Sequence, residues 1–331
     1  MRRVLLTGLA VVAGFVGLVV LLFLVGEVRH WLPFMTGGTM RLTVAIDTAA
    51  YWRDATRETR GSLARTLGRM HVAYDSLEAG DDRVTVHAPP AARAILAGFA
   101  AQQPTQLSLD EPSPGVFVLS PLPAARSARE ASLDSQTAIV LQRRLEMAQG
   151  SAVTVAPAGP HKLTIVFGGN ADPLVLGSLL GTPGVLNIQV VDEDAARAAT
   201  PVVPIGDVLL HWNPDNQPPL PVQRRIAIPG ADIARASQSF DRNGMPDIEI
   251  GLNDDGARAL AHLTSTLLSK RMALVLDGKI LMAPIVNEPI QGGAMIIAGH
   301  FTVAEAQRLA VLISGGGLPA PVHVVSVEVP R

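Results

Sequence analysis

The stretch MALVLDGKILM, residues 272–282, gives a strong local signal of its fold. Two apolar runs, 272–276 and 279–282, flank Asp277-Gly278, and both of these residue types tolerate a positive φ. A two-residue turn of this kind between two apolar runs predicts a β-hairpin.

The sequence before the hairpin predicts the rest of one α/β block. In chain order we expect a strand at 224–229, a helix at 231–240, a strand at 246–252 and a long helix that ends near Lys270. Asn253 or Asp254 is a suitable N-cap for that long helix. Pro and polar residues are dense between 200 and 221, which favours extended backbone and predicts a subdomain boundary or a stiff connector.

Further upstream, one order of elements occurs twice. The first copy comprises a strand at 41–47, a helix at 52–69, strands at 71–74 and 83–87, a helix at 90–101 and a strand at 106–109. The second comprises a strand at 115–118, a helix at 134–149, strands at 152–155 and 162–167, a helix at 172–180 and a strand at 185–191. The β-α-β-β-α-β order is that of ferredoxin-like units, so we predict an α+β protein with two such units in tandem.

Residues 4–26 carry no charged side chain and follow Arg2 and Arg3. A helix of this length covers the roughly 30 Å hydrocarbon core of a bilayer, and basic residues before a span stay on the cytoplasmic side. We therefore expect one membrane anchor, with the residues from about 30 onward outside, which in a bacterial cell is the periplasm. The alternatives are a cleaved signal peptide and a twin-arginine signal, but the segment has no convincing cleavage site and lacks the rest of the twin-arginine pattern.

The composition argues against several classes of function. The formal net charge is −2, so no basic field is present to neutralise nucleic-acid phosphates. The chain has no cysteine, which excludes disulfides, thiol chemistry and cysteine-ligated metal sites. The eight histidines lack metal-binding spacing, and no phosphate-binding loop or hydrolase elbow occurs. We expect no catalytic residue, no cofactor and no metal site.

The hairpin and the sequence after it resemble a known family. Residues 274–293 (LVLDGKILMAPIVNEPIQGG) and 297–310 (IAGHFTVAEAQRLA) closely resemble the periplasmic domain of SecD, a protein-export membrane subunit of the SecDF family. The residues that carry this motif are Asp277, Gly278, Pro284, Pro289, Gly292, Gly293, Gly299, Phe301 and Thr302, with the paired Gly37 and Gly38 upstream.

The resemblance implies three regions. They are a cytoplasmic N-terminus and transmembrane anchor at 1–30, a periplasmic base-like region with the ferredoxin-like units at 38–222, and a second α/β head subdomain with a C-terminal strand at 223–331. Two departures limit the resemblance. The segment that ends at Gly37-Gly38 lacks the family's acidic residue, and the sequence stops at Arg331, whereas five further spans follow in the family. The family's proton-coupled energetics therefore cannot be carried over to this polypeptide acting alone.

The apolar stretch after the turn is the candidate binding site. Ile280, Leu281, Met282 and Ile285 would offer an adaptable apolar surface to a translocating or unfolded polypeptide, or they belong to the core. The first hypothesis is a SecD-like protein of the inner membrane, held in the lipid bilayer through residues 4–26, that assists export with SecF-like or SecYEG-type translocon subunits. The second hypothesis is a membrane-tethered scaffold or regulatory module that does not handle substrate chains.

Overall fold

The structure is a computed structural model, and it describes residues 39–149, 153–168, 173–198, 203–214, 217–299 and 301–328. The expected anchor at 4–26 and the glycines Gly37 and Gly38 lie outside these residues. Among the helices of the described ranges, none is both long and apolar enough to cross a membrane. The described strands form four sheets, so the protein has a mixed α/β fold with several sheets.

One four-stranded antiparallel sheet with two helices forms what we call the base. Its strands, in sheet order, are β16 (Val322–Glu328), β1 (Thr39–Ile46), β7 (Lys162–Gly168) and β6 (Val153–Pro157), and its helices are α4 (Pro123–Gln149) and α5 (Pro173–Gly181). Numbered by chain position, the sheet order is 4-1-3-2, which is the ferredoxin-like arrangement. Val44 of β1 and Leu141 of α4 belong to its core.

Residues 48–121 form a second, compact unit that we call the small unit. It contains α2 (Thr48–Arg69), β2 (Ser76–Ala79), β3 (Val84–His87), a 3-10 turn (Pro90–Ala92), α3 (Arg93–Ala101), β4 (Leu107–Ser113) and β5 (Val116–Pro121). The sheet order is β2-β3-β5-β4, and Leu63 of α2 and Phe117 of β5 are fully buried in its core. This is the ferredoxin-like order with the first strand moved to the end of the chain segment.

The prediction of two tandem units was therefore wrong in its pairing. There are two sheets of four strands with two helices each, as predicted, but two differences from the predicted units are present. β1 belongs to the second unit and β5 to the first, and the last strand of the base is β16 where β8 (Leu186–Val191) was predicted. The reason is physical: α2, with 22 residues, carries the chain about 33 Å away from β1. β5 instead follows β4 through a tight turn at Gly115, whose φ is 78°, and a short loop costs little entropy to close. The strand expected at 71–74 is also wrong, because His71 turns the chain with a φ of 53° and β2 starts at Ser76.

Residues 186–315 form the head. Its five-stranded sheet has the order β14-β13-β8-β10-β9, its three-stranded sheet has the order β11-β12-β15, and helices α7 and α8 pack with them. The bounds are α6 (Glu193–Arg197), β9 (Asp207–Leu210), β10 (Leu220–Ile228), a 3-10 turn (Gly230–Asp232), β11 (Ile233–Phe240), β12 (Pro246–Leu252), α7 (Asp254–Thr266), β13 (Met272–Leu276), β14 (Lys279–Met282), β15 (Ala294–Ala298) and α8 (Val303–Gly315). As predicted, β13 and β14 form a hairpin, and the N-cap of α7 is Asn253.

The structure corrects three predictions in this part. The helix expected at 231–240 is the strand β11, because its mixed small and polar residues form no helical apolar stripe and its backbone pairs with β12 along its whole length. The expected connector at 200–221 contains β9, which pairs with β10 at the edge of the head sheet. The boundary expected after 222 does not separate the sheets, because β8 pairs with β10 and β13, and β16 returns to the base.

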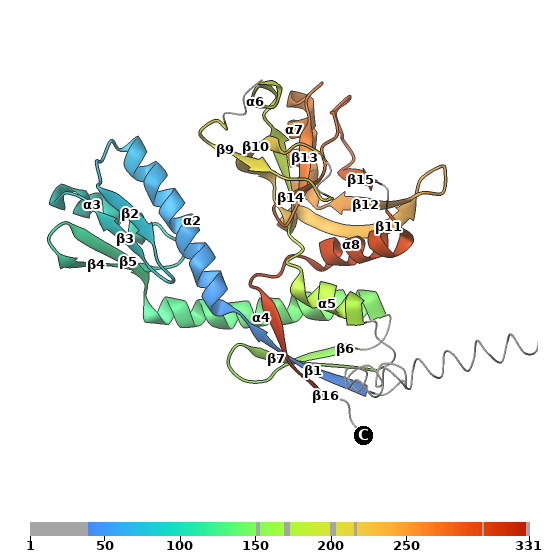
Figure 1. Ribbon diagram of the computed structural model, residues 1–331, viewed down its shortest axis with the longest axis horizontal. Coiled ribbons are helices and arrows are strands. Elements are labelled where there is room, and N and C mark those ends of the chain that lie inside the picture. The colour runs from blue at the N-terminus through green and yellow to red at the C-terminus, as the bar shows by residue number, and fades with distance from the viewer. Residues whose placement is uncertain are drawn as a thin grey trace, which may run out of the picture.

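The three parts meet at α4 (Figure 1). In this view α2 rises from the end of β1 along the sheet of the small unit, and α4 returns below that unit and continues under the head. The head connects to the base through two segments, 182–185, which we call the entry segment, and 316–321, the exit segment.

Candidate functional site

A hollow of about 450 Å³ lies beside β14 in the head. Its walls come from the segment after β9, from β14, from the loop after β15 and from α8; the lining residues are Trp212, Asn213, Pro214, Gln217, Leu281, Gly299, Phe301, Glu305, Arg308 and Leu309. We call it the β14 hollow. It combines two half-buried aromatic rings and two half-buried leucines with one carboxylate and one guanidinium.

β14 contributes Leu281 to this hollow, and among the described residues its outer edge is bridged only at Ile280, so this edge is only partly covered. The Ile280 N–H donates to the carbonyl of His211 at 2.8 Å, and the Asn213 N–H donates to the carbonyl of Ile280 at 2.8 Å. These bonds hold the segment around Trp212 against β14 like a short parallel strand. The Trp212 indole N–H donates to the Pro218 carbonyl at 2.9 Å, which fixes the ring at the rim.

The opposite wall depends on the start of α8. The Thr302 side chain accepts from the Glu305 N–H, and the Glu305 carboxylate accepts from the Thr302 N–H, so this helix begins with a capping box. The hydrogen bond from the Thr302 backbone holds the pKa of Glu305 below its ordinary value. Gly299 leaves room for the Phe301 ring, since a Cβ at Gly299 would lie 2.8 Å from a ring carbon. The capped helix and the missing side chain together place Phe301 at the hollow.

The structure separates the four predicted binding residues. Ile280 is fully buried in the head core, so of the two alternatives for this residue the structure shows the core position. Leu281 lines the β14 hollow, whereas Met282 packs partly buried against the head core. Ile285 is 58% exposed in the loop after β14 but does not line the hollow. Sequence reasoning missed Trp212. The chain has only three tryptophans, and this one lies in a proline-rich stretch, which is a signal that could have been used.

The motif residues of the head have mainly structural positions. Asp277 and Gly278 adopt φ values of 50° and 78°, which the two-residue turn requires. Gly293 has a φ of 62° and packs against Ala257 so closely that a Cβ would approach the Ala257 Cβ to 2.6 Å. The Pro284 carbonyl accepts a hydrogen bond from the Met272 N–H at 3.1 Å. Pro289 and Gly292 are exposed in the loop between β14 and β15.

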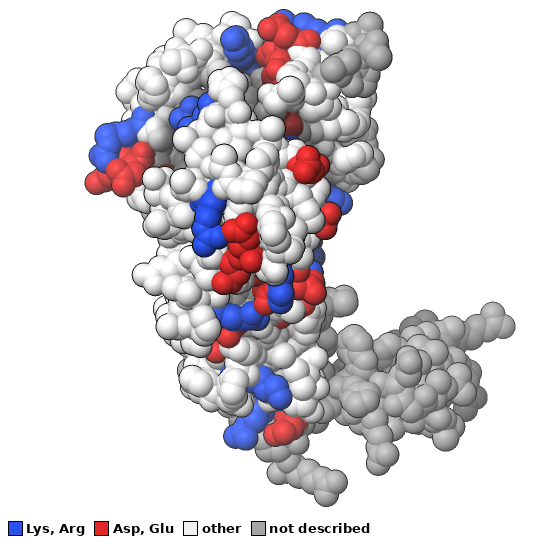
Figure 2. Space-filling model, turned by 90° about the vertical axis from the view of Figure 1, so that its left-hand side faces the viewer, with Lys and Arg blue, Asp and Glu red and all other residues white. Residues whose placement is uncertain are grey.

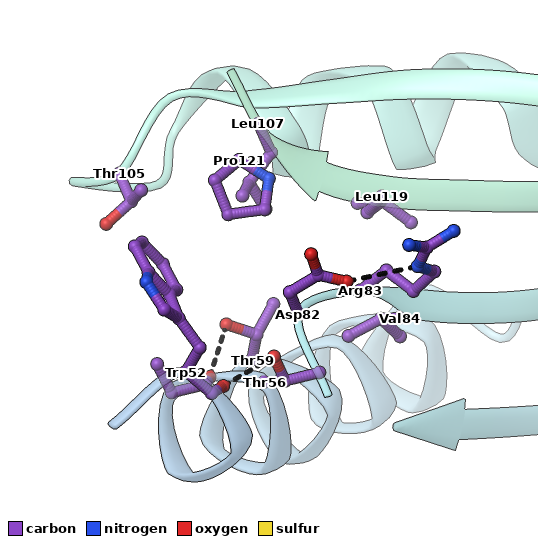
Figure 3. A pocket seen from close by; sticks show the side chains of 11 residues that line it. Trp52, Thr56, Thr59, Asp82, Arg83, Val84, Thr105, Leu107, Leu119 and Pro121 are labelled. Atoms are coloured by element: carbon purple, nitrogen blue, oxygen red, sulfur yellow. Dashed lines mark hydrogen bonds and ion pairs between the residues drawn. The ribbon is translucent and has the colours of Figure 1, made fainter. Parts of the chain in front are cut away.

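A second, much smaller pocket of about 40 Å³ lies between α2 and the sheet of the small unit (Figure 3). The labelled side chains of Trp52, Thr56 and Thr59 on α2 face Leu107 and Pro121 across it, with Asp82 and Arg83 at its side. Its volume is that of one or a few water molecules. It is therefore a packing gap within the small unit and too small for an organic ligand.

Two residues of this lining, Trp52 and Asp82, also belong to a polar network that fixes the small unit on α4. The Trp52 indole N–H donates to the Glu130 carboxylate at 2.9 Å, and Arg126 donates to Glu130 at 3.0 Å and to Asp82 at 2.8 Å. The Arg126 guanidinium also lies 5.4 Å from the centre of the Trp52 ring. Burial raises the pKa of Glu130, but the hydrogen bonds from Trp52 and Arg126 outweigh it and hold this pKa below its ordinary value.

The charge on one face and the metal-binding groups of the described residues are further candidate features beside the β14 hollow. On the face in Figure 2, blue and red side chains lie next to each other, without a broad area of one sign. Within the part of the chain that the structure describes, no three His, Asp or Glu side chains are grouped to hold a metal ion.

Comparison with known proteins gives consistent matches. Residues 207–320 match the family model of the SecDF P1 head subdomain. The chain is 31% identical over 192 residues to protein translocase subunit SecD of Rickettsia bellii, covering 57% of this chain and 37% of that protein. It is 28% identical over 300 residues to protein translocase subunit SecD of Acetobacter pasteurianus, covering 88% of this chain and 57% of that protein.

A solved structure of SecDF, described as a membrane component that enhances protein export, is 24% identical with a TM-score of 0.47, over 60% of this chain and 93% of that chain. The chain thus spans between about two fifths and three fifths of the length of the two SecD relatives named above. The family model lies on the part of the head that contains the β14 hollow, and the chain is similar to part of full-length SecD.

Proposed function

We propose that this chain assists protein export by binding translocating polypeptide in the β14 hollow. The observation that carries the proposal is the combination, in one place, of an apolar surface with a strand edge that is only partly covered. Trp212 and Phe301 supply the aromatic surface, and Leu281 lies at the edge of β14.

This combination suits a ligand of variable sequence. Backbone groups at a strand edge bind any extended chain, while aromatic and aliphatic side chains accept apolar residues without a fixed pattern. Glu305 and Arg308 are exposed at the rim, where each remains solvated and so tolerates either charge on a passing chain. A site with one enclosed cavity and converging catalytic groups would be more selective.

The proposal includes a topology and partners. Residues 4–26 anchor the chain in the inner membrane as a single span with the N-terminus in the cytoplasm and residues from about 30 onward in the periplasm. SecF-like and SecYEG-type subunits are the proposed partners, because the relatives are translocase subunits. Protease added to intact spheroplasts should digest the region from 39 onward; protection of this region would refute the topology.

Site-specific photo-crosslinking tests the binding site. A photoreactive amino acid at Leu281, in cells that are exporting a secretory precursor, should trap that precursor. The matched control is Ile296, which is 57% exposed on β15 but does not line the hollow. If Leu281 traps no more precursor than Ile296, the hollow is not the binding site. If Leu281 traps only folded envelope proteins, the chain is a membrane-tethered scaffold, which is the alternative function.

A further inference from the structure

The head and the base share one helix. Val311 and Leu312 of α8 are buried in the base core, whereas Ala306, Ala310 and Ile313 of the same helix are buried in the head core. α8 also packs on α4, the long helix of the base. The orientation of the head therefore depends on how the C-terminal end of α8 is held against α4.

The side chain at this contact is Arg144 of α4, which is fully buried. Its Nη1 donates to the carbonyls of Leu179 at 2.9 Å and Thr182 at 2.7 Å. Its Nη2 donates to the carbonyls of Pro183 at 2.5 Å and Gly316 at 2.6 Å, and its Nε reaches Gly316 at 3.2 Å. One guanidinium thus bonds to α5, to the entry segment and to the exit segment.

These carbonyls explain why a buried cation is tolerated here. The last carbonyls of a helix lack intrahelical donors and carry the negative end of its dipole. Leu179 lies in the last turn of α5, and Gly316 directly follows α8, so two helix C-termini converge on Arg144. Burial lowers the pKa of Arg144 to about 10, and the negative charge of Asp277 acts in the opposite direction. The side chain therefore stays charged at neutral pH. The hydrogen-bond partners of the guanidinium are backbone carbonyl oxygens.

The segments around the guanidinium are fitted to it. A Cβ at Gly184 would collide with the Arg144 guanidinium, and a Cβ at Gly315 would collide with the Arg144 side-chain stem. The entry and exit segments are also joined directly, since the Leu318 N–H donates to the Pro183 carbonyl at 2.8 Å. Asp277, in the hairpin turn of the head, accepts from the N–H groups of Gly184 and Val185 at 3.0 and 2.8 Å.

We propose that Arg144 is the positioning residue that sets the orientation of the head, and hence of the β14 hollow, on the base. The five donor groups of arginine in one plane reach both connecting segments and α5 at once. Without this fork the two segments lose their common partner, and the head samples other orientations. Arg144 has this role whatever the β14 hollow binds.

Distance measurement by pulsed electron resonance tests this proposal in the full chain. The chain has no cysteine, so Ser135→Cys on α4 and Ser237→Cys on β11 give two unique spin-label sites. Both serines are exposed. We expect one narrow distance peak with Arg144 present and loss of that peak, with a broad distribution instead, in Arg144→Met.

The matched control is Arg143→Met, because Arg143 is the neighbouring residue on α4 and is exposed. This variant should keep the narrow peak. A second label pair within the head, Ser237→Cys with Ser265→Cys, should stay narrow in every variant and so report that the head is folded. If Arg144→Met keeps the narrow peak between Ser135 and Ser237 while only its melting temperature falls, Arg144 is merely structural and the proposal is overturned.

A milder variant covers the case in which Arg144→Met does not fold. Arg144→Lys keeps the positive charge, but its three donors sit on one nitrogen and cannot span all four carbonyl partners. We expect the distribution between Ser135 and Ser237 to broaden in this variant while the pair within the head stays narrow. A single narrow peak in folded Arg144→Lys would contradict the assigned role.

Discussion

Replacing Glu130 by glutamine tests the joint that holds the small unit on α4. The Glu130 side chain is 18% exposed and accepts hydrogen bonds from Trp52 and Arg126. Glutamine keeps an acceptor for the Trp52 indole but removes the negative charge beside Arg126. A hydrogen bond to a charged group contributes roughly 1.5–3 kcal/mol, but the Arg126 side chain is 40% exposed and water screens the pair. We expect E130Q to lower the free energy of unfolding at pH 7 by about 1 kcal/mol.

The pH dependence follows from the direction of the pKa shift. The pKa of Glu130 is lowered in the folded protein, so the stabilisation is present above the unfolded-state pKa of about 4.3 and is lost as the pH falls through the folded value. The difference between E130Q and the parent protein should therefore shrink below about pH 4.

Urea denaturation followed by circular dichroism at pH 7 and at pH 3.5–4 measures both effects. Glu58→Gln is the control, because Glu58 is exposed on α2 and should change the midpoint little at either pH. If E130Q and Glu58→Gln unfold at the same urea concentration at pH 7, the network does not stabilise the joint. If E130Q is less stable than the parent protein by the same free energy of unfolding at both pH values, the loss of stability comes from packing rather than from the charge.

Three further changes probe the small unit, the head and the base. Phe117→Ala should lower the free energy of unfolding by about 3–5 kcal/mol because the ring is fully buried. Limited proteolysis should then cleave the small unit much faster, and an unchanged cleavage rate would contradict the assigned core. Thr302→Ala removes the N-cap of α8 and should lower stability by about 1 kcal/mol in thermal melts, whereas Thr302→Ser should retain most of it. β6 is an edge strand of the base, and the Gln142 side-chain oxygen accepts from its Val155 N–H, so Gln142→Ala should expose this edge and cause the protein to self-associate in sedimentation velocity. Gln136→Ala, at an exposed site on α4, is the control, and a Gln142→Ala protein that stays as monomeric as this control would refute the prediction.

Local signals were the part of the fold that the sequence could predict. The turn at Asp277-Gly278 and the cap at Asn253 depend on a few adjacent residues, and both appear in the structure. The pairing of β1 with β16 could not be predicted, because strand partners are chosen by long-range packing and not by local pattern. β11 was missed for a related reason: its own residues are indifferent, and its ladder with β12 supplies the hydrogen bonds.

The candidate site was predictable only in part. Leu281 was found from its apolar surroundings, but the same pattern selected Ile280, because successive residues of a strand face opposite sides and the sequence does not say which side is buried. Trp212 comes from the segment after β9, Leu281 from β14, and Phe301 and Arg308 from α8 and the residues just before it. Their meeting at one hollow depends on the tertiary fold.

The closure of the base by β16 fixes an order of events as the chain is made. β1 is among the first described strands to emerge, yet its partner β16 is the last, and β7 alone covers its other edge. The small unit and the head are each continuous in sequence and can mature as soon as they have emerged. The sheet of the base cannot be completed until the end of the described chain has emerged. If a ribosome or a membrane pore releases the polypeptide slowly, one edge of β1 therefore stays unpaired until β16 arrives.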